Sequence, residues 1–93
     1  KFGEKFNQTI LPNYLPKNLY KLTFGINFNK RIIKGVLPDN IEILKFSGDY
    51  LCPIKNILPK KLKYLSISDY HSEINFLKDK YIIEYKLDNS FFL

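Results

Sequence analysis

The chain has 93 residues, of which 45% are hydrophobic and 16% aromatic, and its 15 lysine and arginine residues against 9 aspartate and glutamate residues give a net charge of +6. This composition excludes a disordered chain, because such chains combine low hydrophobicity with high net charge. Cys52 is the single cysteine, which excludes an internal disulfide, and no apolar run reaches the roughly 18 residues of a membrane span. We therefore expect an intracellular, cytoplasmic protein that does not act at a membrane.

Apolar residues recur along the chain in four sets with one internal spacing. The second and third residues of each set follow the first by three and five positions, and the sets begin 22, 21 and 20 residues apart. The sets are Leu19, Leu22 and Phe24; Ile41, Leu44 and Phe46; Leu62, Leu65 and Ile67; and Ile82, Tyr85 and Leu87. Since the last two residues of a set are two positions apart, they point to one side of a strand. This spacing predicts short, half-buried strands near 18–24, 40–46, 61–67 and 81–87.

Two further columns and a dipeptide repeat in step with these sets. An aromatic column contains Phe6, Phe28, Tyr50, Tyr70 and Phe91, and an isoleucine column contains Ile10, Ile32, Ile54 and Ile74. Leu-Pro pairs at 15–16, 37–38 and 58–59 precede the first three strands. Proline is tolerated at the first residue of a strand, because the N–H that it lacks is not needed there. The residues between strands contain proline and glycine and favour irregular segments, except 72–80, which could form a helical turn.

A unit of this length cannot bury its apolar face alone, whereas stacked units build one continuous core. The sequence therefore predicts a leucine-rich-repeat-like solenoid over residues 1–93. Its strands form a parallel β-sheet on the concave side, with one short strand per repeat and mostly irregular return segments. Because no polar capping unit is visible at either end, we expect the chain to be a fragment of a longer array.

The repeats resemble a known family. Residues 2–10 read Phe-Gly-Glu-Lys-Phe-Asn-Gln-Thr-Ile, and together with residues 15–25 they are similar to the FNIP repeat. A second copy begins at Phe24 and continues to the Leu-Pro pair at 37–38. The third copy has Leu51 in place of the asparagine, and the fourth keeps only Tyr70 and Ile74, with His71 at the asparagine position. The resemblance implies a leucine-rich-repeat-like fold and a protein-interaction role. Some members carry an F-box-like segment, which makes the array a substrate receptor for ubiquitin ligation.

The concave sheet face is the candidate surface for binding another protein. Its outward residues form two predicted rows, Lys21, Ile43, Tyr64 and Glu84 in the first and Thr23, Lys45, Ser66 and Lys86 in the second, with Tyr20, Lys63 and Ile83 on the flank. Aromatic and apolar residues ringed by lysines are typical of interface anchors. The alternative is that these are ordinary strand residues with high β-propensity.

Asn7 and Asn29 occupy the same place in consecutive copies and are predicted to form a structural ladder, in which side chains bond the backbone of a neighbouring turn. Substitution of the asparagine by Leu51 and His71 predicts that the ladder ends in the later turns.

The sequence contains no pattern that indicates an enzyme, a metal site or a cofactor. His71 is the only histidine, no glycine-rich phosphate loop is present, and Ser66, Ser68 and Asp69 near His71 lack a nucleophile motif. A basic nucleic-acid-binding surface is the alternative function, because lysines and Tyr64 could contact phosphates and stack on bases. Against it stands the single arginine, Arg31. A purely structural spacer is a third possibility.

Overall fold

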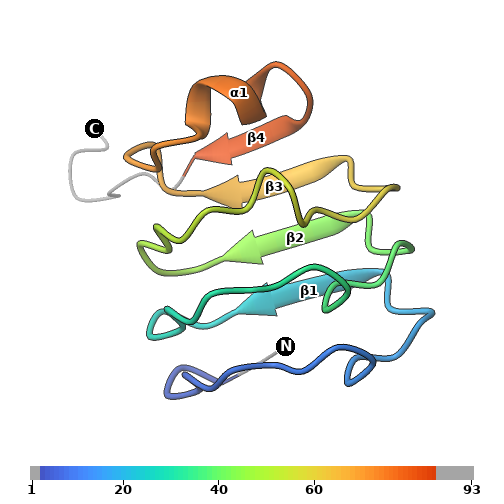
Figure 1. The fold of residues 1–93 in the computed structure, drawn as a ribbon. Helices are drawn as coiled ribbons and strands as arrows, with labels where there is room; N and C mark the ends of the chain where they lie inside the picture. The colour runs from blue at the N-terminus through green and yellow to red at the C-terminus, as the bar shows by residue number, and fades with distance from the viewer. Residues whose placement is uncertain (1–2, 86–93) are drawn as a thin grey trace.

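A computed structural model describes residues 3–85, with the side chains of 3–83. Its elements, in chain order, are β1 (Lys21–Phe24), β2 (Ile43–Phe46), β3 (Tyr64–Ile67), α1 (Ile74–Lys78) and β4 (Ile82–Tyr85). The strands form one parallel sheet in the order β1-β2-β3-β4. Figure 1 shows one coil stacked on the next, with the strands along one wall and the return segments along the other. The predicted solenoid is confirmed, and α1 is the helical turn expected within 72–80.

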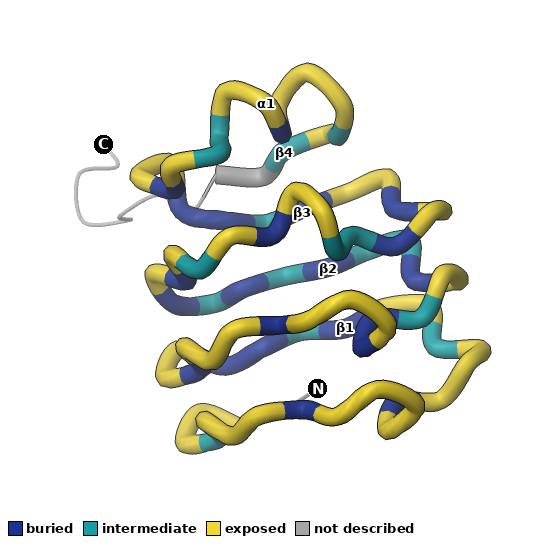
Figure 2. Tube along the Cα trace, in the orientation of Figure 1, coloured by how far each residue is buried: buried dark blue, intermediate teal, exposed yellow. Residues whose placement is uncertain are grey.

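The strand register joins equivalent residues of successive coils. Leu22 pairs with Leu44, and Leu44 pairs with Leu65. These three leucines are at most 2% exposed, whereas the residues beside them in each strand are half-buried or exposed. One side of each strand thus faces the interior, as the two-residue spacing predicts. Buried positions recur along the strands and at single places on the return segments (Figure 2).

Stacked aromatic rings form part of the core. Phe24 and Phe46 stack in parallel with ring centroids 5.1 Å apart, and each also stacks on the ring four residues later in its own coil at 4.2 Å. Those later rings, Phe28 and Tyr50, stack on one another at 5.6 Å, and Phe6 continues their column at 5.9 Å from Phe28. Offset-stacked rings bury large apolar areas and add a directional attraction. The stacking therefore ties neighbouring coils together as well as filling each coil.

The fourth strand differs from the prediction by two residues. The sequence spacing aligns Tyr85 with Leu65, but in the structure Ile83 pairs with Leu65 and Tyr85 pairs with Ile67. The reason is α1, whose Leu77 is fully buried, while the Leu77 carbonyl accepts hydrogen bonds from Lys80 and Tyr81. The chain leaves this helical turn directly into β4, so the fourth coil is shorter than the others. Leu87, the last residue of the predicted set, lies outside the described residues.

The aromatic column also continues differently from the prediction. Tyr70 was expected to extend it, but Tyr70 is 85% exposed and His71 is 2% exposed. His71 follows Ile67 by four residues, just as Phe28 follows Phe24 and Tyr50 follows Phe46. The column is therefore Phe6, Phe28, Tyr50 and His71, and the prediction that His71 occupies the asparagine position is wrong. Phe91, the last predicted member, lies outside the described residues.

The buried phenol of Tyr50 makes the fold sensitive to alkaline pH. Its Oη donates a hydrogen bond to the Lys30 carbonyl at 2.7 Å, and burial raises its pKa above the ordinary value of 10.0, with the nearby Cys52 adding to the rise. The folded state thus holds this proton more tightly than the unfolded state. The resulting stability is fully present below the unfolded pKa and is lost as pH rises from there toward the folded pKa.

We expect the melting temperature of the wild type to fall more steeply than that of Tyr50→Phe between about pH 9 and pH 11. Thermal denaturation followed by circular dichroism across that range measures this. The variant is less stable at neutral pH because it lacks the hydrogen bond, so the slopes are compared and not the absolute values. Lysine deprotonation affects both proteins equally. Parallel slopes would show that Tyr50 does not titrate differently in the two states.

Candidate functional site

The outward residues of the four strands form a continuous exposed sheet face. Its first row follows the register Lys21, Ile43, Tyr64 and Ile82. Tyr64 is 45% exposed and Ile82 is 62% exposed, while Ile43 is half-buried between its neighbours. Three successive strands therefore place apolar side chains side by side next to solvent, with Lys21 at the end of the row.

The second row contains Thr23, Lys45, Ser66 and, by backbone register, Glu84. The prediction placed Glu84 beside Tyr64 in the first row, which is wrong by one row because β4 is shifted by two residues. Ile82 takes the place that was expected for Glu84. Lys86, predicted beside Ser66, lies outside the described residues. Ile83 was expected on the flank, but its pairing with Leu65 puts it on the core side, where it is half-buried.

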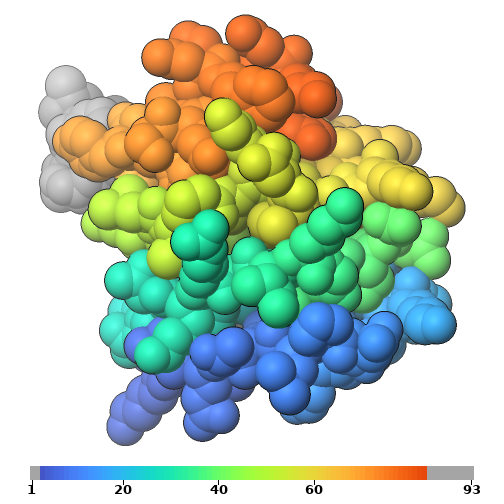
Figure 3. All heavy atoms as spheres, viewed as in Figure 1, coloured from blue at the N-terminus to red at the C-terminus, as the bar shows by residue number. Residues whose placement is uncertain are grey.

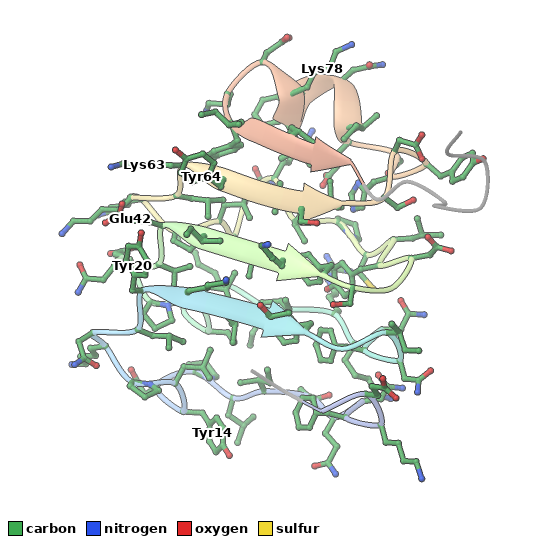
Figure 4. All side chains as sticks on the ribbon, turned by 180° about the vertical axis from the view of Figure 1, so that it is seen from behind. Tyr14, Tyr20, Glu42, Lys63, Tyr64 and Lys78 are labelled. Carbon is green, nitrogen blue, oxygen red and sulfur yellow. The ribbon has the colours of Figure 1, made fainter. Side chains whose placement is uncertain are left out.

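A cluster of polar and aromatic side chains lies at the N-terminal ends of the strands. Figure 4 shows Tyr20, Glu42, Lys63 and Tyr64 together at this end of the sheet. Lys63 Nζ lies 3.1 Å from Glu42 Oε1, and this hydrogen-bonded carboxylate raises the pKa of Lys63. Tyr20 is 55% exposed. The cluster adds a second aromatic ring and a charge pair to the apolar row.

The backbone beneath this cluster is held by bonds between coils. The Glu42 N–H donates to the Tyr20 carbonyl at 2.9 Å, the Lys63 N–H donates to the Glu42 carbonyl at 2.9 Å, and the Ile82 N–H donates to the Lys63 carbonyl at 3.0 Å. Because these bonds extend the ladder beyond the strands, the side chains of the cluster project from a rigid edge. Tyr20 and Lys63 agree with the predicted flank, and Glu42 is an addition that the register reveals. Ile82 is predicted from the spacing to be equivalent to the buried Leu62, which is wrong, because it pairs with Tyr64 and is 62% exposed.

The two asparagines of the predicted ladder contact one another. Asn7 Oδ1 accepts a hydrogen bond from the Asn29 backbone N–H at 2.9 Å, which joins two coils across 22 residues. In the next coil, Cys52 Sγ lies 3.8 Å from the Asn29 carbonyl. A thiol is a weak donor, so this contact is weaker than the hydrogen bond that the Asn29 N–H donates to the Asn7 amide oxygen.

His71 and Glu73 join the last two coils with different chemistry. The Glu73 N–H donates to His71 Nδ1 at 3.0 Å, so the other ring nitrogen, Nε2, is the donor to the Cys52 carbonyl at 2.8 Å. Glu73 Oε1 accepts from the backbone N–H groups of Ile54 and Lys55, at 2.7 and 3.0 Å. These bonds give both residues structural positions, and the fixed ring of His71 is not arranged as a general base.

We expect Glu73→Ala to lower the free energy of unfolding by about 1–2 kcal/mol, because two N–H groups lose their acceptor and that of Ile54 is partly buried. Glu73→Gln keeps an acceptor oxygen and should cost clearly less. Urea denaturation of the three proteins measures the difference. Equal losses in the two variants would indicate that charge, and not hydrogen bonding, is what Glu73 supplies.

The arrangement of the described residues also bears on metal binding and membrane insertion. In residues 3–85, no group of three or more histidine, cysteine, aspartate and glutamate residues is arranged to hold a metal ion. Within the same residues, every helix is too short or too polar to cross a bilayer.

Comparison with known proteins agrees with this geometry. Residues 28–70 match the FNIP Repeat family model. The structure is similar to the crystal structure of CroV588, a novel circular LRR protein, with 37% sequence identity and a TM-score of 0.74 over 91% of this chain. The chain spans 13% of that protein. No curated protein matches the sequence.

Proposed function

Because the chain carries FNIP repeats in a leucine-rich-repeat-like solenoid, we propose that it is a non-catalytic module that binds another protein through its exposed sheet face. Scaffolds of this type generally bind other proteins and are typically non-enzymatic. Their stacked coils align the variable outward positions into one extended surface. The proposal assigns binding to the two rows of that face and to the cluster beside them.

The row of Ile43, Tyr64 and Ile82 is the observation that carries the proposal. The exposed side chains of Tyr64 and Ile82 and the half-buried side chain of Ile43 form a contiguous apolar patch on three adjacent strands, and such patches with a polar rim mark interaction sites. Tyr64 stands in the middle of the patch, next to the ion pair of Lys63 and Glu42. Binding energy in interfaces concentrates in central aromatic residues surrounded by polar groups.

Proximity labelling with the full-length protein in its own cells, followed by affinity measurement with the candidate partner, tests this proposal. Tyr64→Ala should weaken binding by about tenfold or more, as truncation of a central anchor does. Tyr70→Ala is the matched control, because Tyr70 is 85% exposed and lies outside the sheet face. Equal affinities of wild type and Tyr64→Ala would place the interface elsewhere.

The same measurement at two salt concentrations addresses the nucleic-acid alternative. Binding to one protein through an apolar patch should tolerate salt, whereas binding through lysine–phosphate contacts should weaken steeply as salt rises. A steep salt dependence with any polyanion as ligand would favour the alternative.

A finer proposal is that the array forms the substrate-receptor part of an F-box-type protein in the cytoplasm. It is supported by the family resemblance alone. Co-purification of the full-length protein with the adaptor subunit of a ubiquitin ligase, together with imaging of a fluorescent fusion, tests both parts. A full-length protein that never associates with that adaptor would contradict it.

A further inference from the structure

A groove of about 570 Å³ crosses three coils on the return side of the solenoid. Its walls come from the segments around residues 13–17, 34–40 and 56–60, which occupy equivalent places in successive coils. Figure 3 shows this side of the molecule, where the blue, green and yellow segments follow one another from coil to coil. The volume is within the range of about 300–1,000 Å³ that is typical of ligand sites.

The groove has an apolar base and a basic rim. Leu15, Val36 and Leu37 form its buried floor and are 7%, 1% and 6% exposed, while Ile57 and Leu58 also line it and are half-buried, so they offer apolar surface to a ligand. The ammonium-bearing side chains of Lys17, Lys34 and Lys60 also line it and are exposed to solvent. Within the described residues, none of these three side chains takes part in a salt bridge or hydrogen bond. The three charges are therefore free to pair with a ligand, and Asp39 is the one acidic residue of the lining.

Amide groups are the third element of the groove. Asn13, Asn40 and Asn56 line it, one from each coil. Asn40 is held in place, because its Nδ2 donates to the Lys17 carbonyl at 2.9 Å and its Oδ1 accepts from Lys61 Nζ at 2.9 Å. Asn13 and Asn56 are exposed and can donate to and accept from a peptide backbone.

We propose that this groove binds an extended, acidic segment of another protein, with carboxylates on the lysine rim and apolar side chains against the base. Successive side chains of an extended peptide point in opposite directions, so one edge can meet the lysines while the other contacts the half-buried Ile57 and Leu58. Charge complementarity selects an acidic segment, and the apolar base selects one that also carries leucine-like side chains. The groove is lined by return segments and by the corners that precede the strands, and none of its lining residues belongs to the two rows of the exposed sheet face.

The lining favours a peptide over a nucleic acid. Binding of single-stranded nucleic acid combines a basic groove with aromatic side chains on which bases stack. None of the lining residues is aromatic and none is arginine. A nucleic acid would meet the positive charge of the lysines in this groove but no aromatic side chain on which its bases could stack.

A short fluorescein-labelled peptide of alternating glutamate and leucine is the probe. Fluorescence polarisation is measured with the wild type, with the double variant Lys34→Glu and Lys60→Glu, and with the control Lys5→Glu and Lys30→Glu. Both variants change the net charge by the same amount, and Lys5 and Lys30 are exposed residues outside the groove. Thermal denaturation first establishes that each variant is folded.

The proposal predicts saturable binding of the acidic peptide that the groove variant weakens by about tenfold and the control by less than about twofold. The methyl resonances of Ile57 and Leu58 should shift on binding. Absence of binding, or equal weakening by the two variants, would overturn it. It would also be overturned if oligothymidylate displaced the peptide as effectively as unlabelled peptide, or if a matching lysine–leucine peptide bound as tightly.

Discussion

Phe46→Ala is expected to lower the free energy of unfolding by about 3–5 kcal/mol, the largest effect of any single substitution considered for this chain. Phe46 is 1% exposed, and its ring stacks on Phe24 in the coil before it and on Tyr50 in its own coil. Truncation removes the apolar contacts and leaves a cavity that only partly collapses, because rings on both sides are fixed by their own neighbours.

The loss is large compared with the total stability of a small domain, which is about 5–15 kcal/mol. Urea denaturation followed by tyrosine fluorescence and far-ultraviolet circular dichroism measures it. Tyr70→Ala is the control, because Tyr70 is 85% exposed and its truncation should change stability by less than about 0.5 kcal/mol. Similar losses in the two variants would mean that the stacked rings are not the core of the fold.

Gly48→Ala is expected to destabilise the protein by about 1–3 kcal/mol or more, although it adds a single methyl group. A Cβ at this position would overlap the Ile26 carbonyl oxygen and lie 2.8 Å from the carbonyl carbon. The obstacle is backbone of the preceding coil, which cannot move aside as a flexible side chain would. The coils would have to separate locally to accommodate the methyl group, and separation weakens the stacking of Phe24 on Phe46.

Gly3→Ala provides a matched control for this prediction, because a Cβ there meets nothing within 4 Å. The same addition should be neutral or slightly favourable at Gly3, since alanine reduces the conformational entropy of the unfolded chain. Thermal and urea denaturation of both variants measure the contrast. If Gly48→Ala were as stable as Gly3→Ala, the coils would not approach one another as closely as the structure shows.

The first three coils could be predicted from the sequence because their spacing is regular. Leu22, Leu44 and Leu65 align as the repeat predicts, and the strands and the core follow from that alignment. Periodicity is informative here because each coil of a solenoid meets the next in the same way. The exposed row of Ile43 and Tyr64 follows from the same register.

The fourth coil could not be predicted, because its length depends on how α1 packs. The spacing of apolar residues predicts that Tyr85 aligns with Leu65, whereas in the structure, where Leu77 of α1 is buried, Ile83 aligns with Leu65. His71 is different, since its spacing from Ile67 does match the aromatic column. Tyr70 has the residue type of the column but not its spacing, and burial follows the spacing, since His71 is 2% exposed and Tyr70 is 85% exposed. The hydrogen bonds that Glu73 accepts from the preceding coil could not be predicted from periodicity, because the residue does not recur at equivalent places of the other coils.

Nuclear Overhauser effects between methyl groups of equivalent leucines test the stacking most directly. In protein with selectively labelled leucine methyls, cross-peaks should connect Leu22 with Leu44 and Leu44 with Leu65, since these pairs are register partners in adjacent strands. Leu22 and Leu65, separated by a whole strand, should show no direct cross-peak. Absence of the first two cross-peaks in the folded protein would contradict the solenoid, and with it both proposed binding surfaces.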